Sequence, residues 1–219
     1  MTMSVDEIDY FAKVKPRNKW DYHLARNAEL ISANNPQDKV EFERRVSLLA
    51  THKKPTEVTR QLISFITEVE VFNKLHDQGK NPHWIPESNK PKTKAPDIYY
   101  EEQDSKTPVE VKTLHLAADE LEVWANPGNF LEAGPDWGYF KGCEKKLTDF
   151  FADALEKFIH YSGEDFKGEL YLLFMPSSQV RLRDGEDGQP LMHERIERYA
   201  KDNLDKRINI TVMNDYDKW

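Results

Sequence analysis

The sequence predicts an α/β protein, because stretches with helical periodicity alternate with short runs typical of β-strands. Helices are predicted where apolar residues recur at spacings of three and four, over residues 58–75, 143–161 and 191–204. Strands are predicted where β-branched, aromatic and aliphatic residues dominate, over residues 82–86, 95–101, 109–114, 168–175 and 207–213. The predicted order is helix, three strands, helix, strand, helix, strand.

Residues 1–56 are predicted to form a helical extension that precedes a main domain of residues 57–219. Apolar residues at helical spacing indicate two helices in this extension, over residues 21–33 and 40–50. The segment Lys53-Lys-Pro-Thr56 interrupts the pattern and marks the boundary. In the main domain, Gly79 is expected just past the end of the first long helix.

Composition indicates a polar-surfaced globular protein and bears on its partners. The chain has 219 residues, of which 38% are hydrophobic and 32% are charged, with a net charge of −8. An acidic balance is unusual for a sequence-independent nucleic-acid binder, so any such contact must be local. The single cysteine, Cys143, excludes an intrachain disulfide framework, and neither a signal peptide nor a membrane-spanning run is recognisable in the sequence. The expected location is therefore cytoplasmic, without membrane contact.

The candidate chemistry lies in residues 94–112, which are predicted to form a hairpin with a polar turn over residues 102–108. Side chains alternate between the two faces of a strand, so Glu110 and Lys112 share one face while Val111 points to the other. Asp97 stands near the start of the preceding strand. If the two strands pair, two carboxylates and one lysine converge at one place on the sheet.

Such a constellation suits hydrolysis of a phosphodiester bond. Carboxylate oxygens such as those of Asp97 and Glu110 favour Mg²⁺ or Mn²⁺ over soft metals, and a peptide oxygen, for example that of Val111, can complete the ligand set. The metal activates water and neutralises charge on the phosphate. A lysine such as Lys112 can position the attacking water or stabilise the transition state.

The pattern Pro96-Asp97 followed by Glu110-Val111-Lys112 resembles that of the PD-(D/E)xK nuclease superfamily. The resemblance covers about residue 58 to the C-terminus. It implies a restriction endonuclease-like αβββαβ core, with a mixed central sheet flanked by helices, and a Mg²⁺-dependent endonuclease that acts on DNA more than on RNA. It also implies that a glutamate of the first core helix joins the metal site, with Glu68 as the better match and Glu70 as the alternative.

The resemblance further implies a lysine or glutamine that assists the site from the helix over residues 143–161. That helix begins with a cluster of lysines, including Lys145 and Lys146, where positive charge opposes the helix dipole. This placement indicates phosphate contact or simply a solvated helix end. Lys90, Lys92 and Lys94, directly before Asp97, are the other candidate substrate contacts. Homodimers are common among such enzymes and are possible here.

A second hypothesis is a non-catalytic binding protein that has the same fold. An acidic surface suits the binding of a basic protein partner, as in an immunity-type protein that inhibits a nuclease. Fold alone does not decide between the two. The presence of Glu68, Asp97, Glu110 and Lys112 together favours the enzyme, since a purely binding protein does not need all four.

Overall fold

A computed structural model describes the chain at residues 36–49, 55–86, 94–102, 105–114, 139–174 and 192–214. The predicted helix over residues 21–33 lies outside the described residues, and so do Lys90 and Lys92. None of the described helices is both long enough and apolar enough to cross a membrane.

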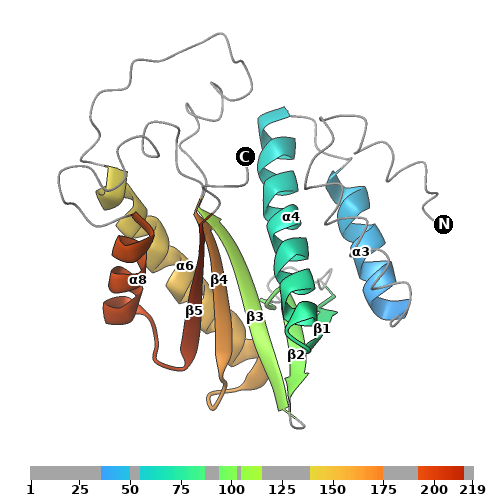
Figure 1. The fold of residues 1–219 in the computed structure, drawn as a ribbon. Helices are drawn as coiled ribbons and strands as arrows, with labels where there is room; N and C mark the ends of the chain where they lie inside the picture. Colours follow the sequence, from blue (N-terminus) through green and yellow to red (C-terminus); the bar gives the residue numbers. More distant parts are fainter. Residues whose placement is uncertain are drawn as a thin grey trace.

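The described chain is of the α/β class, as predicted, and is built around a five-stranded mixed sheet (Figure 1). Neighbouring strands in the sheet follow their order in the sequence: β1 (Asn81–Trp84), β2 (Ile98–Glu102), β3 (Ser105–Leu114), β4 (Gly168–Phe174) and β5 (Ile208–Asn214). The first three strands run antiparallel to one another, while β4 is parallel to β3 and β5 is parallel to β4. All five strands lie where the sequence predicts strands.

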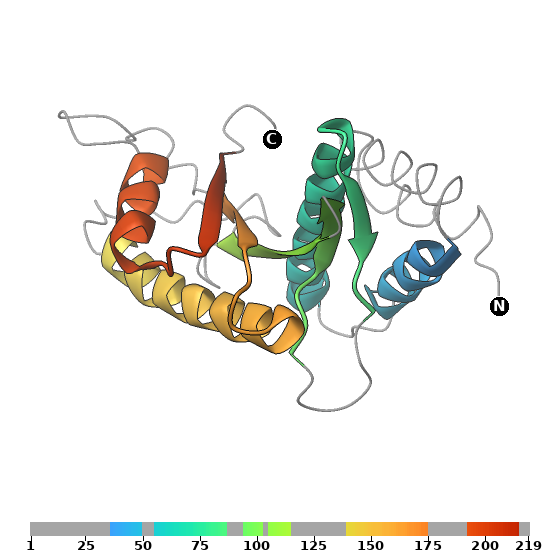
Figure 2. The same cartoon turned by 90° about the horizontal axis from the view of Figure 1, so that it is seen from below.

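Helices cover both faces of this sheet. Their bounds are α3 (Pro36–Leu49), α4 (Pro55–Asp77), α6 (Tyr139–Ser162) and α8 (Met192–Asn203). Figure 2 shows α4 on one side of the sheet and α6 on the other, with α8 beside β5. The predicted long helices are confirmed, with ends that differ by a few residues. As expected, Gly79 follows α4, where its positive φ of 77° closes the helix end.

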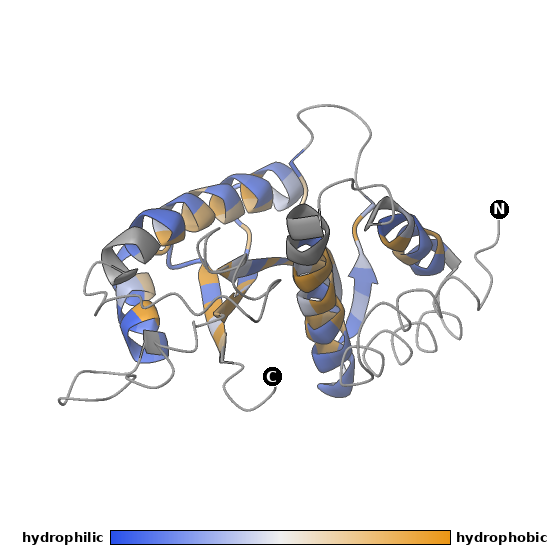
Figure 3. Cartoon of the chain, turned by 90° about the horizontal axis from the view of Figure 1, so that it is seen from above, coloured by the Kyte–Doolittle hydropathy of each residue, from blue (hydrophilic) through white to orange (hydrophobic). Residues whose placement is uncertain are grey.

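Alternation along β3 divides the core into two clusters. Val109 and Val111 pack with α4 and β1, whereas Leu114 packs with α6 and α8. Figure 3 shows hydrophobic and hydrophilic positions alternating along α4 and α6, as expected of helices with one buried face. Because Glu110 and Lys112 share the face of Leu114, this register directs both side chains toward α6.

The hairpin between β2 and β3 is tighter than predicted, so the predicted turn over residues 102–108 is too long. The strands stay paired as far as Glu102 and Ser105, and Pro108 lies within β3 opposite Tyr99. The backbone N–H and C=O groups of Val109 point to β2, since its carbonyl accepts a hydrogen bond from the amide of Asp97. The backbone nitrogen of Pro108, one residue earlier, therefore points to the side of β4, and β4 pairs with β3 only from Val109 onward. Its missing N–H removes no ladder hydrogen bond.

α3 packs into the main core. Phe42 and Val46 on α3 are buried in the same cluster as Phe65 of α4 and Trp84 of β1. Asp38 of α3 also accepts a hydrogen bond from the backbone amide of Trp84 at 2.7 Å, on the outer edge of β1. The predicted boundary between residues 56 and 57 stays a prediction, but α3 shares its apolar contacts with the main domain.

Candidate active site

Asp97 is fixed by three hydrogen bonds where β2 begins. Its amide donates to the Val109 carbonyl at 3.2 Å, and its carbonyl accepts from the Ile85 amide at 3.1 Å. Its carboxylate Oδ2 accepts from the Val111 amide at 2.8 Å. Val111 lies beyond the last β2–β3 residue pair, Ile98 and Val109, so the Asp97 side chain satisfies a donor that β2 no longer reaches. The carboxylate is thus anchored where the two strands diverge.

Glu110 is fully buried beside it, on the face of β3 that points to α6. Its Oε1 is 2.7 Å from the Lys112 Nζ and also forms a short ion pair with the Lys157 Nζ. Its Oε2 is buried and has no hydrogen-bond partner among the described residues. A buried carboxylate oxygen without a partner costs free energy unless something else occupies its lone pairs.

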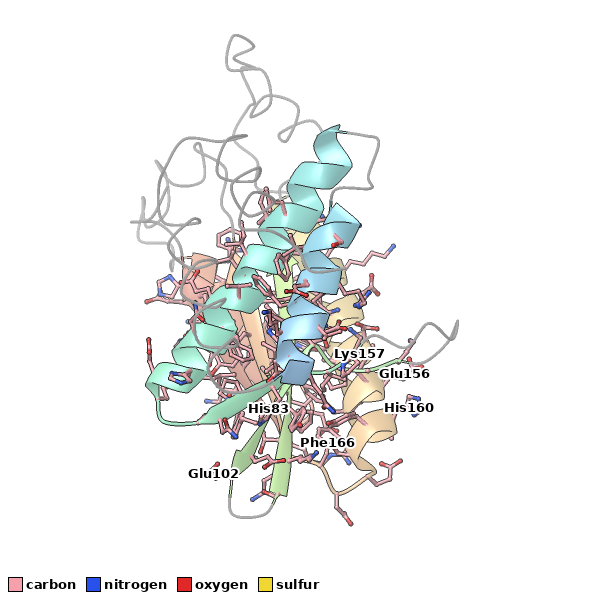
Figure 4. All side chains as sticks on the ribbon, turned by 90° about the vertical axis from the view of Figure 1, so that its right-hand side faces the viewer. His83, Glu102, Glu156, Lys157, His160 and Phe166 are labelled. Atoms are coloured by element: carbon pink, nitrogen blue, oxygen red, sulfur yellow. The ribbon has the colours of Figure 1, made fainter. Side chains whose placement is uncertain are left out.

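α6 completes the cluster with Asp153 and Lys157, which stand four residues apart on one side of the helix. The Lys112 Nζ lies 2.7 Å from Asp153 Oδ2, and the Lys157 Nζ lies 3.5 Å from the same oxygen. Figure 4 shows Lys157 directed toward the sheet, while Glu156 and His160 of the same helix point outward. The result is a network of two lysines between Glu110 and Asp153.

Burial and charge set the protonation of this network. Burial is the largest influence on the pKa of Glu110; together with repulsion by Asp97 it outweighs the two lysines and raises that pKa to about 7. Burial would lower the pKa values of Lys112 and Lys157, but attraction to Asp97 and Glu110 raises both. Both shifts favour the protonated ammonium groups at neutral pH, which suits charge stabilisation.

Glu68 reaches this region through an arginine. Its carboxylate forms a short ion pair with Arg45 of α3. Arg45 is itself buried; its Nε lies 2.9 Å from Glu41 Oε1 and its Nη2 donates to the Ile85 carbonyl at 3.2 Å. Glu70, the alternative to Glu68, is partly buried two residues further along α4. The structure thus brings Asp97, Glu110 and Lys112 together, and ties Glu68 to Arg45 beside them.

Whether these residues fit a divalent ion is a question of donor chemistry. Within the described residues, no group of three or more His, Cys, Asp or Glu side chains is close enough to hold a metal ion. Mg²⁺ usually takes only one or two carboxylates and keeps several waters. Asp97 and the unpartnered Oε2 of Glu110 supply such a pair. Burial is the main cause of the raised pKa of Glu110, and repulsion by Asp97 adds to it; a cation between the two carboxylates would relieve that repulsion. The donor type, a pair of carboxylates, fits Mg²⁺ or Mn²⁺.

The predicted substrate lysines lie at different places. Lys94 is partly exposed next to the cluster, where it pairs with Glu156 and lies 3.9 Å from Asp153 Oδ1. Lys145 and Lys146 are exposed near the start of α6. At 1.5 Å per residue they are roughly 17 Å along the helix from Lys157. Their contact with substrate stays a prediction, but they do not belong to the carboxylate cluster.

Sequence reasoning missed Arg45, Asp153 and Lys157. A signal for the last two existed, since they form a charged pair at positions i and i+4 that borders the apolar face of α6. It could not be distinguished from an exposed pair without the placement of α6 against β3. Arg45 forms a similar i, i+4 pair with Glu41, but its partners Glu68 and Ile85 lie 23 and 40 residues away in the sequence.

In comparisons with protein-family models, curated proteins and solved structures, nothing matches this chain. The functional argument therefore depends on the residues and their geometry alone.

Proposed function

We propose that the protein is a divalent-metal-dependent nuclease with a restriction endonuclease-like core of the PD-(D/E)xK type, and that DNA is its expected substrate. The observation that carries this proposal is the convergence of Asp97, Glu110 and Lys112 where β2 and β3 diverge. The order α4, β1, β2, β3, α6, β4 supports it, since the resemblance implies a helix, three strands, a helix and a strand.

In this proposal Asp97 and Oε2 of Glu110 hold Mg²⁺ or Mn²⁺, with the Val111 peptide oxygen as a further candidate ligand. When bound, the ion lowers the pKa of a coordinated water and neutralises charge on the phosphate. Lys112 and Lys157 hold Oε1 of Glu110, which leaves Oε2 for the ion. The hydrogen bond from Val111 keeps the Asp97 carboxylate beside it.

The two lysines then act on the phosphate. Both stay protonated, so they stabilise negative charge as the water oxygen bonds to phosphorus and the bond to the leaving oxygen breaks. Lys157 takes the role that the resemblance assigns to a lysine or glutamine in this helix. Asp153 orients both ammonium groups through its ion pairs.

The test is cleavage of DNA and RNA with Mg²⁺ or Mn²⁺ by the wild type and by Asp97→Ala and Lys112→Ala. Each substitution is expected to lower the rate roughly 100-fold or more, because Asp97→Ala removes a ligand of the ion and Lys112→Ala removes a cation that stabilises charge on the phosphate. Lys201→Ala, which changes an exposed lysine on α8 that has no proposed role, is the matched control and should cleave as the wild type does. Unchanged cleavage in both site variants would contradict the proposal.

A binding protein on the same fold remains the second candidate, favoured by the net charge of −8. A thermal melt with and without Mg²⁺ separates the two. The nuclease predicts a rise in Tm that is lost in Asp97→Ala, since only the folded state holds the ion. Equal melting temperatures with and without Mg²⁺ favour the binding protein.

A further inference from the structure

Arg45 is a charged residue that is buried, although α3 carries it. It comes from α3, within the predicted N-terminal extension, and only 8% of its side chain is exposed. A buried guanidinium needs partners for its five donors and its charge. Arg45 finds them in Glu41 of its own helix, Glu68 of α4 and the carbonyl of Ile85 just after β1. Its guanidinium also lies over the ring of Trp84, 4.8 Å from the ring centroid.

The contacts of Arg45 lead to Asp97. Its Nη2 donates to the Ile85 carbonyl at 3.2 Å, and the Ile85 amide donates to the Asp97 carbonyl at 3.1 Å. Arg45 therefore fixes Ile85, and Ile85 in turn fixes the backbone of Asp97. The charge acts on the same place, because Asp97 attracts the Arg45 cation, as Glu68 and Glu41 do.

The same contacts define what Glu68 does. Its carboxylate pairs with Arg45, and Glu41 on α3 anchors the guanidinium from the other side. A residue that holds a ligand-bearing element through one intermediate contact commonly matters nearly as much as the ligand itself. Planar, two-sided anchoring of this kind requires arginine, because lysine offers a single charged point.

We propose that Arg45 is a positioning residue of the candidate active site, which fixes Asp97 through Ile85 and is itself anchored by Glu41 and Glu68. Glu68 then acts on the site through Arg45, as its anchor. α3 is in this way part of the site, although it lies outside the core that the resemblance covers. The expected effect of Arg45 on metal binding rests on the proposed nuclease function, whereas its positioning of Asp97 rests on the contacts of Arg45 alone.

The experiment measures Mn²⁺ affinity by electron paramagnetic resonance and exchange of the Ile85 amide by NMR, in the full chain. Arg45→Met is expected to weaken Mn²⁺ binding by roughly 10- to 100-fold and to speed exchange of the Ile85 amide. Arg44→Met is the matched control, since Arg44 also pairs with Glu41 on the same helix and is 31% exposed. It should leave both measurements at their wild-type values.

Arg45→Lys decides the matter if Arg45→Met fails to fold. Lysine keeps the positive charge but lacks the planar guanidinium with its several donors. Mn²⁺ binding should therefore weaken roughly 3- to 10-fold, and the Ile85 amide should exchange faster. Wild-type Mn²⁺ affinity in either folded Arg45 variant would overturn the inference and leave the nuclease proposal intact. An equal loss in Arg44→Met would also overturn it, because the effect would then belong to α3 in general.

Failure of the proposed function gives a different result. If the wild type binds no Mn²⁺, the nuclease proposal is wrong, and the Ile85 amide then decides on Arg45 alone. Faster exchange in Arg45→Met would still support its positioning of Asp97. Unchanged exchange would overturn that as well.

Discussion

Glu110→Gln should change how the stability of the metal-free protein depends on pH. In the folded state the pKa of Glu110 is raised from 4.5 to about 7. A shift of this size corresponds to about 3 kcal/mol, at 1.36 kcal/mol per unit. Between the two pKa values the folded protein binds more protons than the unfolded chain. The contribution of Glu110 to stability is therefore fully present below pH 4.5 and is lost as the pH rises through 7.

Glutamine imitates the protonated carboxyl at every pH, so the variant lacks this loss. Urea unfolding at several values between pH 4.5 and 8, with a chelator present, measures the effect. The free energy of unfolding of the wild type, relative to Glu110→Gln, should fall by about 3 kcal/mol across that range. Glu156→Gln, an exposed carboxylate on α6, is the control and should keep the wild-type slope. A difference that is flat or rises with pH would refute the reasoning.

Three further substitutions test individual contacts. Lys157→Met should lower metal-dependent cleavage roughly 10-fold or more, while Lys201→Met, at an exposed position of α8, should not. Equal rates in Lys157→Met and the wild type would remove Lys157 from the site. Gly168→Ala places a Cβ 2.5 Å from ring atoms of Phe158; we expect a loss of about 1–3 kcal/mol in urea unfolding, and non-additivity with Phe158→Leu, whereas additive losses would contradict the clash. Asp38→Ala leaves a buried backbone amide of β1 without its acceptor and should cost about 1–3 kcal/mol; a wild-type unfolding midpoint would show that water replaces it.

Much of the fold follows from sequence patterns because those patterns are local. The apolar periodicity of α4 and α6 and the dense apolar run of β4 are each visible within one segment. Alternation along β3 was enough to place Glu110 and Lys112 on one face, and the antiparallel pairing brings Asp97 beside them. The length of the β2–β3 turn was predicted wrongly, since whether Pro108 interrupts the ladder depends on where β4 begins.

The rest of the site depends on contacts that no local pattern records. Lys157 meets Glu110 only because α6 crosses β3 at that height. Arg45 reaches Glu68 and Ile85 because α3 packs against α4 and β1. Charged residues of this kind are common on exposed helix faces, so their burial becomes evident only in the folded chain.

A crystal soaked in Mn²⁺ and measured at the manganese absorption edge tests the central claim most directly. The account predicts one anomalous peak between Asp97 and Glu110, at about 2.1 Å from a carboxylate oxygen of each, with Glu110 Oε1 still held by Lys112 and Lys157. It also predicts that the peak is lost in Asp97→Ala. A saturated crystal without that peak, or with manganese bound only elsewhere, would contradict the assignment of this cluster as the metal site of a nuclease.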